Sequence, residues 1–574
     1  MKNFGTNLKF AWKYAKEQKS KMIKYIILNA ASMIISIIVP IISANIIIAL
    51  TDNKFEQLIY MATTILFLEG ISNFITYFSK YYAQVIYRET FTKIQTNLGA
   101  EILKLENKTI DNYSSGVFIQ RLTNDTSKLA DIFNALNIYL MNIITDLGIF
   151  AAIFIIDKIA FIYMIIVTII LYIVEAKRVE NYTEKDKLFR NKNERVSGFV
   201  GELVRGIRDI KMLNSEESFI DELHSKVIDL NKTRYDMQNV DRKFTLMRHF
   251  TRDFAEFFLI VLLVILIQNN KIAVASALII HNYSGRVLSI VNYIGILLDK
   301  VKDFNLSSSR IFTIINSEEF SKEKFGTKKI PKVKGNFEFK NVEFSYNKDI
   351  VLKDLSFKIN ANETVAFVGK SGVGKSTVFN LLCKMYNINK GKITIDGIDI
   401  NDLDRETIRG NITIISQNPY IFNVSIKENL KLVKKDLTDE EMFEACKMAC
   451  LHDFIEALPN GYDTIIGEGG VNLSGGQKQR LAIARALVQK TEIILFDEAT
   501  SALDNETQTS IQKAIENMKN EYTILIIAHR LSTVINSDRI LYLENGKVQA
   551  EGTHSELLKT SSEYRKLCES EIEK

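Results

Sequence analysis

Long apolar runs fill the first half of the chain and are missing from the second half. Residues 25–50 contain no charged side chain, and a helix of that length can cross the roughly 30 Å hydrocarbon core of a bilayer. Five similar segments follow, so the pattern predicts six membrane-spanning helices. The weakest segment needs a helix that extends back past Glu256, because its uninterrupted apolar stretch covers only residues 257–267. The five segments are 58–79, 132–156, 159–174, 254–268 and 272–298.

Charge at the start of the chain predicts its orientation in a membrane. Lysines cluster before the first apolar run, and basic segments stay on the cytoplasmic side. The N-terminus is therefore expected in the cytoplasm, and six crossings would place the second half there as well. The chain is expected to be a multi-pass protein of the cell membrane. The lysines are Lys2, Lys9, Lys13, Lys16, Lys19, Lys21 and Lys24.

The second half has the pattern of an α/β domain. A polar, lysine-rich stretch over 316–335 comes first, and strand-like runs at 337–346 and 354–359 follow it. The alternation of strand-like and helix-like segments then continues to the end of the chain. We interpret the chain as a membrane domain over 1–315, a linker over 316–335 and an α/β domain over 336–574. The net charge of +5 gives no reason to expect a nucleic-acid partner.

A glycine-rich segment has the spacing of a phosphate-binding loop. GKSGVGKST (369–377) fits G-x-x-x-x-G-K-[ST] and follows the apolar run TVAFV. The glycines let backbone N–H groups approach phosphate oxygens, and the N-terminus of the next helix adds positive potential. Lys375 is expected to reach the β- and γ-phosphates of ATP, and the Ser376 hydroxyl to bind Mg²⁺. The expected nucleotide contacts are Gly369, Lys370, Ser371, Gly372, Val373, Gly374, Lys375, Ser376 and Thr377.

Polar residues also follow other apolar, strand-like runs. Asp497 ends the run IILFD and suits Mg²⁺, while Glu498 suits orienting or deprotonating the attacking water. Gln417 and His529 follow two further runs. Because the carboxyl ends of parallel strands meet at one edge of a sheet, where α/β ligands bind, we expect these groups near the phosphate loop. A solvent-exposed acidic pair and a structural histidine are the alternative interpretations.

A second candidate anion site has no lysine or metal ligand of its own. The segment VNLSGGQKQRLAIARAL (471–487) predicts a helix that starts after a serine and two glycines. Ser474, with N–H groups near Gly475 and Gly476, could contact the γ-phosphate of ATP held by the phosphate loop of another chain. Since each motif occurs once, this interpretation requires a dimer. An ordinary serine-capped helix is the alternative, and it accounts for Ser474 but not for the glycines.

Together these motifs resemble those of an ATP-binding cassette (ABC) transporter of the exporter type, over nearly the whole chain. Residues 369–376 match the Walker A motif, 493–498 the Walker B motif and 473–477 the signature motif. The resemblance implies that Gln417 lies in the Q-loop and serves Mg²⁺, and that Glu498 and His529 are catalytic. It also implies that Tyr346 stacks on adenine, with Phe344 as the fallback. The implied signature contacts to nucleotide are Ser474, Gly475, Gly476 and Gln477.

The resemblance implies a fold and an activity. The fold is a polytopic α-helical membrane domain of six helices fused to an α/β P-loop NTPase domain of ABC type. The activity is ATP hydrolysis coupled to export by alternating access, with ATP and Mg²⁺ as cofactors. Short coupling helices are implied near 111–115 and 214–218, with solvated amphipathic helices as the alternative. The implied partner is a second half-transporter. Intact Walker B and signature motifs favour a homodimer, and a heterodimer remains open.

The cargo is the least defined feature. Ionisable groups inside membrane spans are costly and tend to face a cavity or a partner. The ionisable residues inside the predicted spans favour an amphipathic cargo, such as a drug, lipid or peptide. Pairs of residues that pack the helices together would explain these residues equally well. An ATP-gated channel or regulator without net pumping, a membrane-anchored soluble P-loop enzyme and an importer are the rival functions. The candidate groups are Glu69, Asp146, Glu256, His281 and Arg286.

Overall fold

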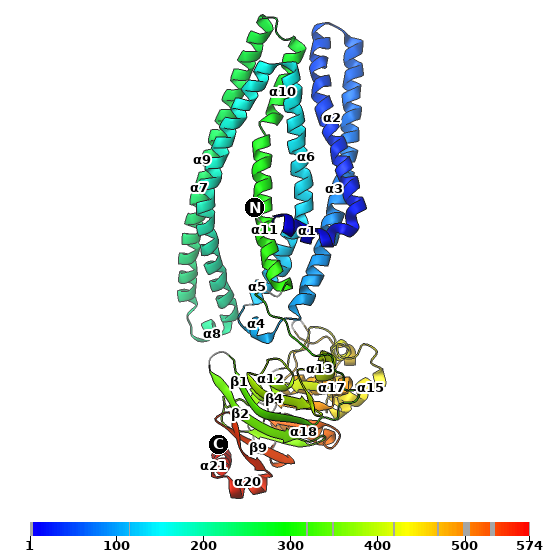
Figure 1. Ribbon diagram of the computed structural model, residues 1–574, viewed down its shortest axis with the longest axis vertical. Helices are drawn as coiled ribbons and strands as arrows, with labels where there is room; N and C mark the ends of the chain where they lie inside the picture. Colours follow the sequence, from blue (N-terminus) through cyan, green and yellow to red (C-terminus); the bar gives the residue numbers. More distant parts are fainter. Residues whose placement is uncertain are drawn as a thin grey trace. The chain divides into compact units, whose positions relative to one another are not determined.

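The computed structural model describes residues 4–113, 115–316, 319–346, 349–416, 419–467, 470–497, 505–527 and 534–572. The chain divides into two compact units (Figure 1). The helical unit comprises Met1–Leu103 and Ser115–Glu319, and the α/β unit comprises Lys104–Ser114 and Phe320–Lys574. A short segment from the first half of the sequence therefore packs with the second unit, and it overlaps the coupling helix that the family resemblance implies near 111–115.

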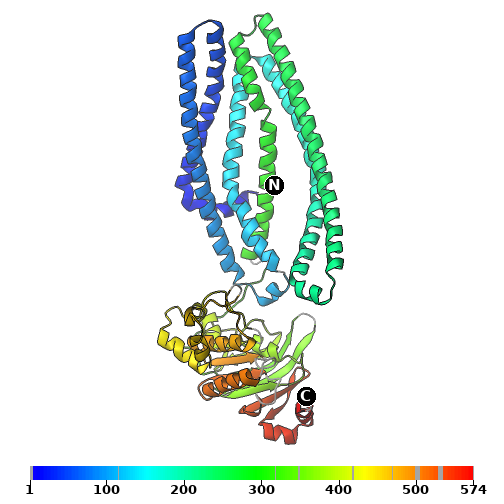
Figure 2. The same ribbon diagram turned by 180° about the vertical axis from the view of Figure 1, so that it is seen from behind.

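Long helices build the helical unit. Helices α2 and α3 run side by side, and so do α7 and α9 (Figures 1 and 2). The elements are α1 (Phe4–Ala15), η1 (Lys16–Gln18), α2 (Lys19–Thr51), α3 (Phe55–Ile102), α5 (Ser115–Gln120), the π-helical η2 (Arg121–Asp125), α6 (Thr126–Ile156), α7 (Lys158–Arg205), α8 (Ile207–Met212), α9 (Glu216–Gln268), α10 (Val274–Val287) and α11 (Ile290–Ile315).

Among the described residues, five stretches are long and apolar enough to cross a membrane. The predicted span at 254–268 is not among these five stretches, because it is not long and apolar enough. It forms the end of α9, a continuous helix of 53 residues. The helix does extend back past Glu256, and its Leu259 and Leu263 are buried against α6, α7 and α10. The five stretches are Phe4–Thr51, Phe55–Ile102, Gly116–Ile156, Lys158–Arg205 and Val274–Ile315.

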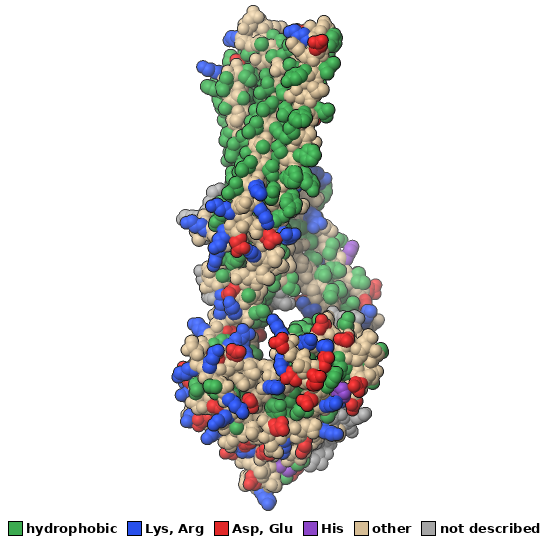
Figure 3. All heavy atoms as spheres, turned by 90° about the vertical axis from the view of Figure 1, so that its right-hand side faces the viewer, with side chains coloured by type: hydrophobic (Ala, Val, Ile, Leu, Met, Phe, Trp, Pro, Cys, Tyr) green, Lys and Arg blue, Asp and Glu red, His purple; other side chains and the backbone are tan. Residues whose placement is uncertain are grey.

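The surface of the helical unit is divided by polarity. On the face that Figure 3 shows, hydrophobic side chains cover its upper part, while charged side chains gather on its lower part. Leu66, Phe67 and Ile155 are among the large apolar side chains that are mostly exposed. Water would disfavour such a continuous apolar surface, whereas lipid would accept it.

Two sheets form the frame of the α/β unit. The antiparallel sheet has the order β2-β1-β4-β5, and the larger sheet has the order β10-β9-β3-β8-β7-β6. In the larger sheet β9, β3, β8, β7 and β6 are parallel, and β10 pairs antiparallel to β9. Strands β3 and β8 are buried along their whole length, as expected for a parallel sheet covered on both faces.

The remaining bounds place the α/β elements along the chain. They are α4 (Asn107–Asp111), β1 (Phe337–Ser345), β2 (Ile350–Ile359), β3 (Thr364–Val368), α12 (Lys375–Leu382), β4 (Lys390–Ile395), β5 (Ile398–Asp399), α13 (Arg405–Arg409), β6 (Ile412–Ile415), α14 (Ile426–Lys431), α15 (Asp439–Met448), α16 (His452–Glu456), η3 (Gly461–Asp463), α17 (Gly475–Gln489), β7 (Ile493–Asp497), α18 (Asn505–Met518), β8 (Thr523–Ile527), β9 (Arg539–Glu544), β10 (Lys547–Gly552), α20 (His554–Thr560) and α21 (Ser562–Ile572).

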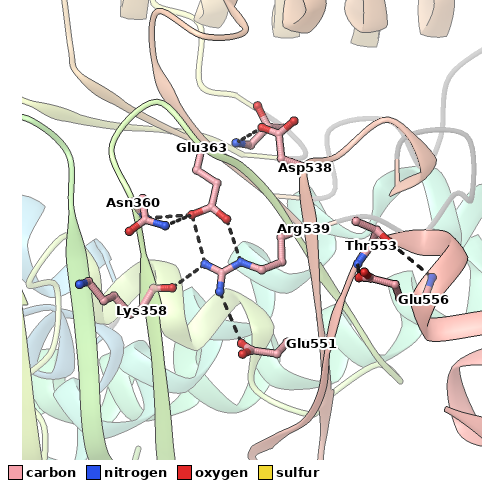
Figure 4. A network of polar contacts seen from close by, with 9 residues as sticks. Lys358, Asn360, Glu363, Asp538, Arg539, Glu551, Thr553 and Glu556 are labelled. Carbon is pink, nitrogen blue, oxygen red and sulfur yellow. Dashed lines mark hydrogen bonds and ion pairs between the residues drawn. The ribbon is translucent and has the colours of Figure 1, made fainter. Parts of the chain in front are cut away.

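A polar network fixes the starts of two central strands (Figure 4). Arg539, the first residue of β9, donates to the Glu363 carboxylate (2.8 Å) and to the Lys358 carbonyl (2.6 Å). Asp538 accepts from the backbone N–H of Thr364, the first residue of β3 (2.9 Å). The last residue of β3, Val368, pairs with Tyr542 of β9, and the phosphate loop begins directly after Val368.

Candidate nucleotide-binding site

The predicted phosphate loop lies between β3 and α12. Gly374 precedes α12 with a left-handed φ of 103°, and a Cβ there would lie 2.6 Å from a methyl group of Leu352. The left-handed conformation favours glycine, and a side chain here would also displace Leu352. The Lys375 ammonium turns back into the loop and donates to the carbonyls of Gly369 (2.7 Å) and Lys370 (3.0 Å). Lys375 is only 5% exposed, so its charge is concentrated where the loop N–H groups and the helix N-terminus converge.

Oxygen ligands meet beside this lysine. The Ser376 hydroxyl donates to Asp497 Oδ1 at 2.9 Å, which joins the first turn of α12 to the end of β7. A hydroxyl and a carboxylate are ligands that Mg²⁺ accepts. The residues present therefore fit a magnesium ion at the edge of the phosphate loop.

The sheet register aligns the strand ends that precede the other predicted residues in the sequence. Ile527 at the end of β8 pairs with Phe367 of β3 and with Asp497 of β7. Ile415, which ends β6, pairs with Phe496. In the sequence Glu498 comes one residue after β7, and Gln417 and His529 come two residues after β6 and β8. All three lie outside the described residues. Their catalytic and metal-binding roles stay predictions.

The signature segment forms a capped helix start at the surface. The Gln477 N–H donates to the Ser474 hydroxyl (3.3 Å), and the Ser474 N–H donates to the Gln477 side chain (2.8 Å). Ser474 and Gly475 are exposed and Gly476 is buried. The serine-capped helix considered from the sequence is therefore present. The cap lies at the surface, where a second chain could reach it. A contact between this cap and the nucleotide of a second chain stays a prediction.

Tyr346 offers an aromatic surface next to the phosphate loop. Its hydroxyl lies 3.3 Å from the Thr377 hydroxyl, and its ring is 36% exposed. Phe344 is buried, with its ring packed edge-on to Tyr346 (4.9 Å between centroids). A base could stack on Tyr346 but could not reach the face of Phe344, so the geometry favours Tyr346 over the fallback.

Sequence reasoning missed Tyr386, which no motif marks. Its ring packs edge-on to Tyr346 (5.1 Å), and its hydroxyl donates to Asp111 Oδ2 at 2.6 Å. Burial, and then the hydrogen bond to the Asp111 carboxylate, raise the pKa of the Tyr386 phenol. The phenol is therefore a protonated donor at physiological pH.

Two of the ionisable residues predicted inside membrane spans lie together. Asp146 of α6 is fully buried, and its Oδ1 lies 3.7 Å from Arg286 Nε of α10. This is the helix-packing pair that the sequence left open as the alternative to a cargo contact. Glu69 is exposed, and Glu256 and His281 are half-buried.

Comparison with known proteins defines the class. The ABC transporter family model matches residues 352–501, and the ABC transporter transmembrane region matches residues 22–290. The Bacillus subtilis (strain 168) protein named "Putative multidrug export ATP-binding/permease protein YgaD" is 32% identical over 504 residues, 86% of each chain. The ATP-dependent lipid A-core flippase of Pasteurella multocida (strain Pm70) is 45% identical over 260 residues, 45% of this chain and 44% of the flippase.

A helical membrane region and an ATP-binding region in one chain are the two parts of an exporter half-transporter. The chain belongs to the ABC transporter family. It is a multi-pass membrane protein that binds ATP and couples ATP hydrolysis to export, and its family implies dimerisation and a transported substrate.

Proposed function

We propose that two copies of this chain form a homodimer that exports an amphipathic molecule by alternating access. The observation that carries the proposal is the convergence of Lys375, Ser376 and Asp497 at one sheet edge. This half-site has cationic and oxygen ligands, while the exposed turn at Ser474 offers a hydroxyl and backbone N–H groups at a helix start. Each would supply what the other lacks if ATP lay between the two chains.

The residues of the half-site have distinct roles in the proposed reaction. Lys375 and the loop N–H groups bind the phosphates. Ser376, Asp497 and Gln417 would hold Mg²⁺, which would neutralise phosphate charge. Glu498 orients and deprotonates the attacking water, and His529 stabilises the phosphate that accumulates charge. The partner's signature turn then closes the opposite side. ATP binding closes the dimer, and hydrolysis reopens it.

The cargo proposal uses the relatives as support. The names of the two relatives describe multidrug export and lipid A-core flipping. The multidrug relative aligns over most of its length, whereas the flippase aligns over less than half. We therefore propose that the cargo is an amphipathic drug, lipid or peptide. It is exported from the cytoplasmic side of the membrane, where the N-terminus and the α/β unit lie in this proposal.

The variant Glu498→Gln tests the reaction. It should retain ATP binding, accumulate a closed ATP-bound dimer and lose nearly all steady-state ATPase, because the water loses its base while the phosphate contacts stay. Phosphate release from purified protein in nanodiscs measures turnover, and a structure of the trapped variant shows whether Ser474 reaches the facing nucleotide. Glu492→Gln at the start of β7 is the matched control and should keep normal turnover. Wild-type ATPase in Glu498→Gln would contradict the proposal.

A further inference from the structure

Helix α3 carries one carboxylate inside its predicted membrane span. Glu69 lies near the middle of the run 58–79, with eleven residues of the run before it and ten after it. At a rise of about 1.5 Å per residue, it lies about 15 Å from either end of the run, close to the centre of a hydrocarbon core about 30 Å thick. Glu69 is exposed, and Ser79 is the first buried residue of α3.

The described part of the chain provides no counter-ion for this carboxylate. Among residues 4–113 and 115–316, which include all six predicted spans, neither a hydrogen bond nor an ion pair involves the Glu69 side chain. An ionised group at the centre of a bilayer is costly in free energy unless a cation or a polar group accompanies it. Glu69 therefore needs a partner that a single copy of the chain does not supply.

Glu69 belongs to a polar side of α3. Asn73 and Thr76 follow it by four and seven residues, a spacing that places the three on one side of the helix, and both are exposed. Phe67 and Phe74 lie on the other side and are each 71% exposed, as expected for side chains that face lipid. At this depth α3 therefore has separate polar and lipid-facing sides.

The polar side of α3 turns toward α6. Ala83 and Tyr87 follow Glu69 by 14 and 18 residues, close to four and five full turns, so they lie on the same side of the helix. The Asn134 side chain of α6 donates to the Ala83 carbonyl (3.3 Å), and the Tyr87 hydroxyl lies 2.9 Å from the Ser127 hydroxyl of α6. The exposed polar side at Glu69 thus continues a side that packs inside the helical unit.

Charges inside the six predicted spans do not balance. The spans contain three carboxylates and one arginine, and that arginine, Arg286, lies 3.7 Å from the buried Asp146. The third carboxylate, Glu256, and the histidine His281 are both half-buried. A second identical copy would add the same excess of carboxylates and no further lysine or arginine at this depth. A cation carried by a mobile molecule would balance Glu69 instead.

We propose that Glu69 binds the positive charge of an amphipathic cationic cargo near the bilayer centre, with Asn73 and Thr76 as hydrogen-bonding neighbours. The inference rests on the proposed export function and narrows its cargo to a cation. The attraction is strong because little water competes at this depth. Leu66, one turn away and 72% exposed, offers apolar surface to the body of the cargo. A neutral or anionic amphiphile of the same shape would gain nothing from the carboxylate.

Two ions of the same shape and opposite charge test the proposal. Tetraphenylphosphonium and tetraphenylborate both enter membranes, and equilibrium dialysis measures their binding to the full chain in nanodiscs after subtraction of uptake by empty nanodiscs. The wild type should bind the phosphonium about tenfold or more tightly than the borate. In Glu69→Gln, which keeps the size of the side chain, the phosphonium affinity should fall about tenfold or more.

Matched variants separate charge from structure. Glu69→Asp keeps the charge and should bind the phosphonium within about threefold of the wild type. Glu56→Gln removes an exposed glutamate from the first turn of the same helix, outside the predicted span, and should not change binding. Size-exclusion chromatography and the Tm of Glu69→Gln should match the wild type, because the carboxylate makes no contact that holds the helices together.

Three results would overturn the inference. If Glu69→Gln binds the phosphonium as tightly as the wild type, or if the wild type shows no preference for the phosphonium, Glu69 does not select a cation. If Glu69→Gln dissociates into monomers while the wild type stays dimeric, the carboxylate belongs to the contact between copies. Failure of the proposed export is distinct: phosphonium would bind through Glu69, but inside-out vesicles would not take it up when ATP is added.

Discussion

The charge of Lys375 is placed for an anion that approaches from outside the protein. Two carbonyls of its own loop accept hydrogen bonds from the ammonium, and the side chain is buried apart from the site itself. Opposite charges attract each other more strongly in a site that excludes water than at an exposed surface. Phosphate oxygens therefore gain more from this lysine than they would from an exposed one.

Replacing Lys375 by alanine should weaken ATP binding. The variant loses charge-assisted hydrogen bonds to the phosphates worth about 3 kcal/mol, which corresponds to an affinity loss of about 100-fold. Titration with a fluorescent ATP analogue measures the affinity, and Lys392→Ala in β4 serves as a control with an exposed lysine. Unchanged affinity in Lys375→Ala would contradict the assignment of the phosphate loop.

At the scale of elements, the bridge between Arg409 and Glu323 joins α13 to the stretch that leads out of the membrane region. Both side chains are largely buried, and both guanidinium contacts are short. Removing one partner leaves a carboxylate without its cation in a poorly hydrated place, which is far more costly than losing an exposed ion pair.

The variant Arg409→Met should destabilise the α/β unit by about 3 kcal/mol and lower its Tm by about 6 to 12 °C. Calorimetry of the intact chain in detergent measures the shift. Lys328→Met removes an exposed ion pair to Asp402 of comparable length (3.0 Å) and should change the Tm by no more than about 2 °C. Equal shifts in the two variants would show that burial of the Arg409 bridge contributes nothing.

Local sequence predicted the elements that carry their own signals. The run TVAFV is β3, the glycines after it take the conformations that the loop needs, and the serine of the signature caps α17. Contacts between distant segments carried no such signal. Nothing near Asp111 or Tyr386 indicates that their side chains meet, and the polar stretch after residue 315 gave no sign that Phe320 would be fully buried.

Hydropathy also fails where a helix serves two environments. Helix α9 is charged along most of its length and apolar only near its end, so its average composition does not pass as a membrane span. Its apolar end nevertheless packs with α6, α7 and α10. The sequence predicts a span here only if the helix extends back past Glu256, and α9 does so.

At the scale of the whole molecule, each nucleotide-binding motif occurs once in the chain. The Walker A side has the cation and the oxygen ligands, and the signature side has an exposed helix start. If the two sides belong to one composite site, they must come from different copies. This arrangement predicts a behaviour that neither a monomer nor a dimer with sites inside each chain would show.

Mixed dimers of two inactive variants should regain activity. In a dimer of Lys375→Ala with Ser474→Arg, both lesions fall in one composite site, and the other site has an intact lysine and an intact serine. Each variant alone has two damaged sites and should hydrolyse ATP at a few percent of the wild-type rate or less. The mixed dimer, isolated through two different affinity tags, should occlude about one nucleotide and recover measurable ATPase. If each site used the lysine and serine of the same chain, every site in the mixed dimer would be damaged. Activity no higher than that of the two parents would then exclude the composite site.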